Sequence, residues 1–136
     1  AHTGSLNWPI IALYFAGIFW TLFYDTIYAY QDSQDDLIIG VKSTAILFGA
    51  HAKKWLLSFI LFCFVLMAVS VFVVTQERTI LSKFVTFIGV LSFLLHLFSQ
   101  WKNFDANDSQ VLLSLFRSNR NAGFIFAIFL CLAIWV

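Results

Sequence analysis

Residues 55–75 read WLLSFILFCFVLMAVSVFVVT, an apolar run without a single charged side chain. About 20 apolar residues in a helix are the length that crosses the hydrocarbon core of a bilayer. The apolar residues are continuous rather than alternating, so the run lacks the period of two that the strand of a membrane barrel has. This stretch predicts a transmembrane helix, and with it an all-α, polytopic transmembrane helical bundle.

The composition of the whole chain agrees with a membrane location. The 136 residues are 61% hydrophobic and only 11% charged, whereas about a quarter of the residues in a soluble domain are charged. Three more apolar runs cover residues 8–30, 80–100 and 122–136. The last of these is short for a full span, so we expect it to begin a turn earlier or to tilt little. The sequence thus predicts about four spans.

The loops between these spans predict the orientation of the protein. Residues 31–54 and 101–121 form two long polar loops, and residues 76–79 form a tight turn on the other side. The side of the long loops carries six Lys and Arg, including Arg117 and Arg120, against two on the other side. Because basic residues concentrate in cytoplasmic loops, we expect 31–54 and 101–121 to face the cytoplasm or the mitochondrial matrix. A net charge of +1 without a basic run excludes a nucleic-acid partner.

Several isolated residues have structural interpretations. Cys63 and Cys131 lie inside apolar runs without a neighbouring Cys or His, which favours small core residues over metal ligands or a disulfide. An ionisable residue in a span, such as His96, is a functional candidate, but a place at the interface or a hydrogen bond to another helix explains it equally well. We expect Asn119 to cap the last helix and Asp108 to be a loop charge or a cap.

Acidic residues gather where the first span ends. The segment YDTIYAYQDSQDD, residues 24–36, holds four of the seven acidic residues of the chain. If the first helix continues through it, a rotation of 100° per residue places Asp25, Asp32 and Asp36 on one narrow stripe. Asp35 then points away. Like charges on one stripe repel, and carboxylates without His or Cys suit Mg²⁺. On spacing alone, a solvated helix end is an equally good interpretation.

A short amphipathic helix is predicted just after the carboxylates. Its sequence is KSTAILFG, residues 42–49, in which Ser43 or Thr44 is a candidate cap and Gly49 a candidate end. We expect this helix to lie over the membrane surface near the acidic segment.

The wording of these two segments resembles the second aspartate-rich motif of the UbiA superfamily of intramembrane prenyltransferases, in its 4-hydroxybenzoate polyprenyltransferase branch. The family pattern is close to YD-x-x-YA-x-x-D-x-x-DD followed by G-x-KSTA. The matching residues are Tyr24, Asp25, Tyr28, Ala29, Asp32, Asp35, Asp36, Gly40, Lys42, Ser43, Thr44 and Ala45. Weaker resemblances at LLHLFSQ (94–100) and LFRSNRNAGF (115–124) extend the likeness over the whole chain.

The resemblance also implies what is absent. Enzymes of this family carry two aspartate-rich motifs in a bundle of roughly nine helices, and the first motif, similar to N-D-x-x-D-x-x-x-D, does not occur in these 136 residues. Residues 1–136 are therefore expected to be the C-terminal part of a roughly nine-helix UbiA-type domain, with the second motif at 25–36. The N-terminal half of the same enzyme is then the expected partner.

The function implied by the resemblance is a step of ubiquinone biosynthesis: Mg²⁺-dependent transfer of a polyprenyl group from its diphosphate to the ring of 4-hydroxybenzoate. Its setting is the bacterial or mitochondrial inner membrane. Asp32 and Asp36 are the expected Mg²⁺ ligands, while Asp25 is expected to lie behind them or to contact the aromatic substrate. Lys42 is a candidate for gripping a phosphate oxygen and Tyr28 for a hydrogen bond to substrate.

Two alternatives remain open beside this function. One is a non-catalytic, truncated membrane fragment, which the missing first motif favours. The other is a UbiA-type enzyme with a different aromatic acceptor. A transporter or channel needs polar residues deep in several spans, and the second and fourth predicted spans have almost none.

Overall fold

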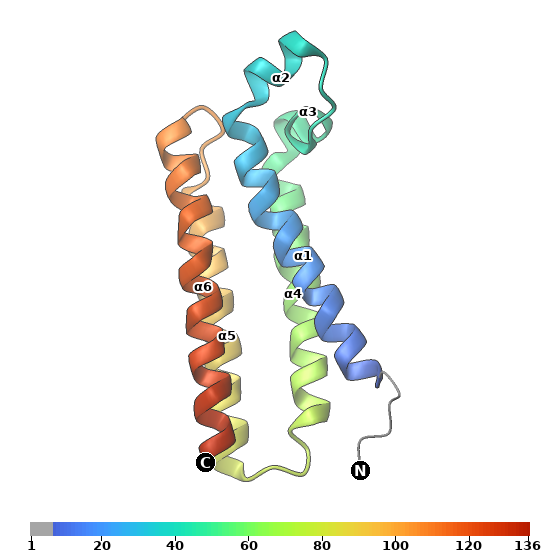
Figure 1. The fold of residues 1–136 in the computed structure, drawn as a ribbon, viewed down its shortest axis with the longest axis vertical. Helices are drawn as coiled ribbons and strands as arrows, with labels where there is room; N and C mark the ends of the chain where they lie inside the picture. Colours follow the sequence, from blue (N-terminus) through green and yellow to red (C-terminus); the bar gives the residue numbers. More distant parts are fainter. Residues whose placement is uncertain (1–6) are drawn as a thin grey trace.

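The computed structural model describes residues 7–136, which contain helices and no strand (Figure 1). The elements in chain order are α1 (Trp8–Gln31), α2 (Ser33–Ile39), α3 (Thr44–Phe48), the 3₁₀ turn η1 (Gly49–His51), α4 (Ala52–Val74), α5 (Ile80–Asn103) and α6 (Ser109–Trp135). The predicted all-α class is confirmed.

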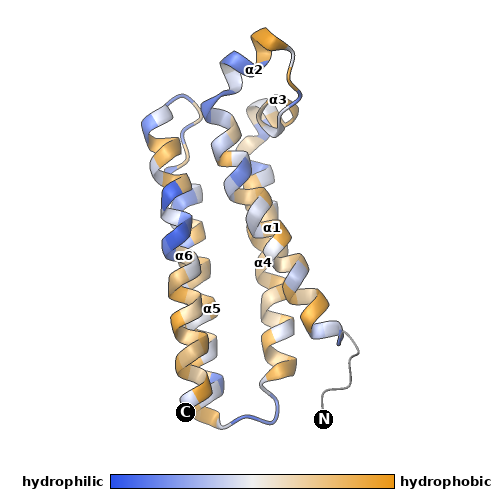
Figure 2. Ribbon diagram, in the orientation of Figure 1, coloured by the Kyte–Doolittle hydropathy of each residue, from blue (hydrophilic) through white to orange (hydrophobic). Residues whose placement is uncertain are grey.

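Four helical stretches of the described chain are long and apolar enough to cross a membrane: Trp8–Gln31, Thr44–Val74, Ile80–Asn103 and Ser109–Trp135. The four predicted spans are therefore confirmed. Hydrophobic residues occupy most of the length of these helices (Figure 2). Many large apolar side chains are exposed, among them Phe62 on α4 and Phe84 on α5. Hydrocarbon is the medium in which such an outer surface is stable.

The long helices pack as two pairs, α1 with α4 and α5 with α6. α1 and α6 form the front layer of the bundle in Figure 1, and α4 and α5 lie behind them. α2 and α3 sit together at one end, and the α4–α5 turn lies at the opposite end. The side chains that are buried between the helices include Phe23, Ile27, Leu56, Ile60, Leu97 and Leu112.

The last helix begins earlier than its apolar run suggests. α6 starts at Ser109, so the predicted loop 101–121 shrinks to residues 104–108 and the prediction for this segment is wrong. The Asp108 side chain accepts hydrogen bonds from the backbone N–H groups of Gln110 and Val111, which confirms it as a cap. The first turns of α6 are polar on one side only, and Leu112 and Leu115 are buried on the other. Hydropathy located the apolar part of this helix and missed its amphipathic part.

The prediction that the first helix continues through residues 24–36 is wrong. It ends at Gln31, and Asp32 has φ −103° and ψ 7°, outside the helical region. Ser33 donates its hydroxyl to the Tyr30 carbonyl at 3.0 Å, a local bond of the kind that competes with the helix ladder. The short helix expected at 42–49 is confirmed as α3, which follows Ser43 and ends at Phe48, with Gly49 as its C-cap.

Gly89 lies where α5 approaches α6 closely. A Cβ atom built on it would lie 2.5 Å from the Phe129 Cβ atom on α6. We therefore expect Gly89→Ala to force the two helices apart and to destabilise the protein by about 1–3 kcal/mol. Gly17→Ala is the matched control, because a Cβ there meets nothing within 4 Å. Unfolding by SDS titration in mixed micelles measures both, and equal stability of the two variants would contradict the packing.

Candidate functional site

The acidic segment lies at the end of the bundle where α1, α2 and α3 meet (Figure 1). The helix break changes the relation of Asp25 to the later carboxylates, so the predicted three-residue stripe does not form as a continuous helix face. The one-turn spacing of the other two persists, because the Asp36 N–H donates to the Asp32 carbonyl oxygen at 2.9 Å. α2 then ends at Ile39. Its C-cap is Gly40, whose φ of 74° is a left-handed conformation that glycine adopts without strain.

Contacts between helices hold this end of the molecule in place. The Tyr30 hydroxyl donates to the Gly49 carbonyl oxygen at 2.8 Å, which ties the end of α1 to the end of α3. The Tyr30 ring also packs edge-on against Phe104, with centroids 5.4 Å apart. Nearby, the Trp101 indole N–H donates to the Lys53 carbonyl oxygen at 2.8 Å. These hydrogen bonds and ring contacts thus connect the end of α1, next to the acidic segment, with α3, the start of α4 and the end of α5.

The other predicted site residues lie toward the same end. Asp25 is exposed on α1, two turns before the break. Tyr28 is 41% exposed, and its ring packs against Phe116 of α6 with centroids 4.8 Å apart. Lys42 is exposed in the short link between α2 and α3. Asp32 is exposed and Asp36 half-buried, so all five groups can reach a ligand from outside the bundle.

The acidic segment offers the carboxylate oxygens that a hard cation prefers, but it does not form a complete coordination shell. Within residues 7–136, no three His, Cys, Asp or Glu side chains are grouped as a metal-binding set. Mg²⁺ does not need such a set, because it is commonly held by one or two carboxylates, with phosphate oxygens and water completing the shell. Asp32 and Asp36 can supply those two carboxylates.

A buried polar network joins α1, α5 and α6 below the acidic end. The Asn119 amide donates to Gln100 Oε1 at 2.9 Å and accepts from the Trp20 indole N–H at 3.0 Å. Gln100 in turn donates to Ser118 Oγ at 2.8 Å. Asn119 lies inside α6 and does not cap it, so that prediction is wrong. His96 Nε2 lies 3.1 Å from the Ser118 carbonyl oxygen, which confirms the hydrogen bond to another helix.

Sequence reasoning missed Gln100 and Trp20 as members of this network. The i, i+4 spacing of His96 and Gln100 was a usable signal, because it places both on one face of α5. The local sequence does not indicate that this face of α5 packs against α6.

A pocket lined by aromatic rings and two arginines lies between α1 and α6, beside this network. Its volume is about 530 Å³, and its walls are Trp20, Tyr24, Phe116, Arg117, Asn119 and Arg120. The two arginines belong to α6, whereas the sequence predicted them in a loop. Figure 2 shows this hydrophilic stretch of α6 below the end of the helix. Charged residues in membrane-spanning helices are costly and often functional, so this pair is a functional candidate.

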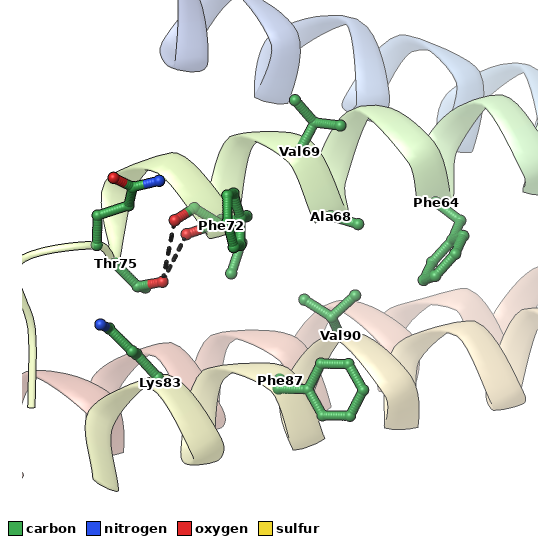
Figure 3. Close-up of a pocket in the computed structure, with 10 residues that line it drawn as sticks. Phe64, Ala68, Val69, Phe72, Thr75, Lys83, Phe87 and Val90 are labelled. Carbon is green, nitrogen blue, oxygen red and sulfur yellow. Dashed lines mark hydrogen bonds between the residues drawn. The ribbon is translucent and has the colours of Figure 1, made fainter. Parts of the chain in front are cut away.

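A second cavity, of about 720 Å³, lies between α4 and α5 near the turn at the opposite end of the bundle. Its walls are mostly apolar, with Phe64, Phe72 and Phe87 around the interior and Lys83 near one end (Figure 3). No carboxylate lines it. It therefore offers space for hydrocarbon and no group that would bind a metal.

The fold defines this chain as an integral membrane protein of helical-bundle type, with an acidic segment at one end. The chain belongs to the UbiA prenyltransferase family, because the model of that family matches residues 1–128. This confirms the resemblance seen in the sequence. No solved structure matches the chain.

The relatives with curated names point to one branch of the family. The chain is 40% identical to the mitochondrial 4-hydroxybenzoate polyprenyltransferase of Dictyostelium discoideum, over 93% of this chain and 26% of the relative. It is 42% identical to the protein of that name from Bos taurus and 39% identical to the one from Homo sapiens, in each case over 85% of this chain and 29% of the relative. The chain thus spans between a quarter and a third of the length of these relatives.

Proposed function

We propose that this chain contributes the second aspartate-rich half-site of a Mg²⁺-dependent 4-hydroxybenzoate polyprenyltransferase that acts in ubiquinone biosynthesis. The observation that carries the proposal is the pair Asp32 and Asp36, held one turn apart at an open end of a bundle of this family. The names of the relatives support the aromatic acceptor.

Each predicted residue has a role in this proposal. Asp32 and Asp36 would hold Mg²⁺, which when bound neutralises charge on the departing diphosphate. Lys42, on its short link, places a point charge where a phosphate oxygen can be gripped. Tyr28 and Asp25 line the approach from α1 and orient the acceptor. The N-terminal part of the same enzyme, with the first aspartate-rich motif, would complete the diphosphate site. Residues 1–136 would then be the C-terminal part of the domain.

The proposed setting is the inner membrane of a bacterium or a mitochondrion, with the acidic end on the cytoplasmic or matrix side. The position of Arg117 and Arg120 within α6 weakens the charge count without reversing it. Without them, six basic residues on that side become four, against Arg78 and Lys83 at the other end. The bias still favours the same orientation.

Two alternatives are distinguishable by assay. The first is a non-catalytic membrane fragment. A different aromatic acceptor is compatible with membership of the family as such. Both predict that no polyprenyl group reaches 4-hydroxybenzoate.

The test is product formation in membranes that contain the protein at its full encoded length, with polyprenyl diphosphate, 4-hydroxybenzoate and Mg²⁺. We expect ring-prenylated product, complete loss on chelation with EDTA, and recovery when Mg²⁺ is restored. Residues 1–136 expressed alone should give no product, because half of the diphosphate site is absent. Turnover with other hydroxylated aromatic acids but not with 4-hydroxybenzoate would identify another acceptor. Metal-independent turnover would contradict the mechanism.

A further inference from the structure

The cavity between α4 and α5 changes from polar to apolar along its length. Lys83 and Thr75 lie near each other at one end, next to the turn that joins the two helices, and Phe64 lies toward the other end (Figure 3). Gln76, the chain neighbour of Thr75, also lines the cavity. The remaining walls that residues 7–136 form are apolar side chains. The cavity therefore matches a ligand with one polar end and a hydrocarbon body.

Lys83 gives the polar end a positive charge. It is the only charged residue among the walls that the described part of the chain forms, so no carboxylate among them neutralises its ammonium group. The Thr75 hydroxyl already donates to the Val71 carbonyl oxygen at 2.8 Å, whereas the Gln76 amide carries two N–H donors. A phosphate group fits an ammonium group and amide donors. The cationic part of a zwitterionic headgroup finds no anion among these walls.

The length of the cavity corresponds to one leaflet of a bilayer. From Phe64 to Thr75, α4 rises by about 16 Å, and half of a hydrocarbon core about 30 Å thick is about 15 Å. The polar end lies at the turn where the two spans end, so the apolar part extends inward from the membrane boundary. Phe72 and Phe87 line the cavity and are 68% and 61% exposed, so the cavity opens at the surface of the bundle. An acyl chain can therefore enter it sideways from the bilayer.

We propose that this cavity binds one anionic phospholipid, with the phosphate at Lys83 and an acyl chain along Phe64 and Val90. A volume of about 720 Å³ is in the range of cavities that hold small amphipathic ligands. The site lies at the opposite end of the bundle from the acidic segment and does not depend on the proposed function. A polyprenyl diphosphate would have its charged group at that acidic end, so the ligand at Lys83 comes from the other leaflet.

Native mass spectrometry of the delipidated protein, at its full encoded length, tests the headgroup. The probes are phosphatidylglycerol and phosphatidylcholine with identical acyl chains, which differ in net charge. We expect the wild type to bind phosphatidylglycerol about fivefold more tightly, the effect of one lysine beside an anionic lipid. Lys83→Gln should lose this preference. Arg78→Gln, the matched control, removes the same charge from the same end of the bundle but not from the cavity walls, so its preference should stay within about twofold of the wild type.

A second pair of variants tests the hydrocarbon part of the site. Ala68→Phe places a ring in the apolar part of the cavity and should weaken phosphatidylglycerol binding about tenfold. Val65→Phe is the control, because Val65 is an exposed residue of α4 outside the cavity, and its binding should not change. In membranes, phosphatidylglycerol with a diazirine midway along its acyl chain should label the wild type near Phe64 on α4 and near Val90 on α5.

Three results would overturn the assignment. Equal affinity of the wild type for the two lipids, or an equal loss in Lys83→Gln and Arg78→Gln, would reduce Lys83 to a general surface charge. Absence of label from α4 and α5 would mean that another part of the full-length enzyme fills the cavity. Displacement of the labelled lipid by polyprenyl diphosphate would make the cavity the site of a prenyl chain. None of these measurements uses prenyl transfer, so the proposed function can fail while the lipid site stands.

Discussion

Replacing Asp32 or Asp36 by Asn is expected to reduce prenyl transfer about a hundredfold or more while the protein still inserts and folds. Asn keeps the shape of the side chain but removes the negative charge that attracts Mg²⁺. A loss of about 3 kcal/mol of transition-state stabilisation corresponds to a hundredfold in rate. Folding should persist, because Asp32 is exposed, Asp36 is half-buried, and the hydrogen bond that joins these residues uses backbone atoms.

The measurement is initial rate against Mg²⁺ concentration in membranes matched for protein content. Glu77→Gln serves as the control, because it neutralises a carboxylate in the turn at the opposite end of the bundle. Its rate should equal that of the wild type. Full turnover in both the Asp32→Asn and Asp36→Asn proteins would remove these residues from the metal site and leave a solvated helix end as the better interpretation of the segment.

The second large effect is expected at Asn119, which joins three helices. Asn119→Leu removes its bonds to Trp20 and Gln100 and leaves their polar groups buried without partners. An unsatisfied buried group costs about 1–3 kcal/mol, so we expect a loss of about 2–4 kcal/mol in the free energy of unfolding. Interhelical hydrogen bonds in membranes are often weaker than this, but Asn119 is buried and carries two of them.

SDS titration in mixed micelles checks this expectation, and Asn121→Leu is the matched control on an exposed position of the same helix. A double-mutant cycle with Trp20→Phe isolates the bond between the indole and the amide, whose coupling we expect at about 1 kcal/mol. If Asn119→Leu unfolds at the same SDS fraction as Asn121→Leu, the network does not stabilise the bundle.

Much of the architecture was predictable because a membrane imposes a simple rule. The apolar run at 55–75 became α4, Ala52–Val74, and the run at 80–100 became α5, Ile80–Asn103. A backbone in hydrocarbon must satisfy its own hydrogen bonds, so an apolar run of sufficient length has to be a helix. The same rule is silent where a helix leaves the apolar layer, which is why the polar start of α6 was assigned to a loop.

The site was predictable in part, for a similar reason. Residue type and spacing pointed to Asp32 and Asp36, since a one-turn relation survives even across the break before Ser33. The alignment of Asp25 with them assumed an unbroken helix, and local bonds of Asp and Ser residues are what interrupt helices. Arg117 and Arg120 were not predicted as site candidates, because their charge indicated a loop.

The sequence by itself determined that this protein crosses the membrane about four times, belongs among the UbiA prenyltransferases and carries its carboxylates at the end of the first span. These properties depend on residues close together in the chain. The tertiary structure decided which helix faces meet: it placed Asn119 between Trp20 and Gln100. It also placed Arg117 and Arg120 of α6 in one pocket with Trp20 and Tyr24 of α1. Such contacts join residues that are up to 99 positions apart, and only packing brings them together.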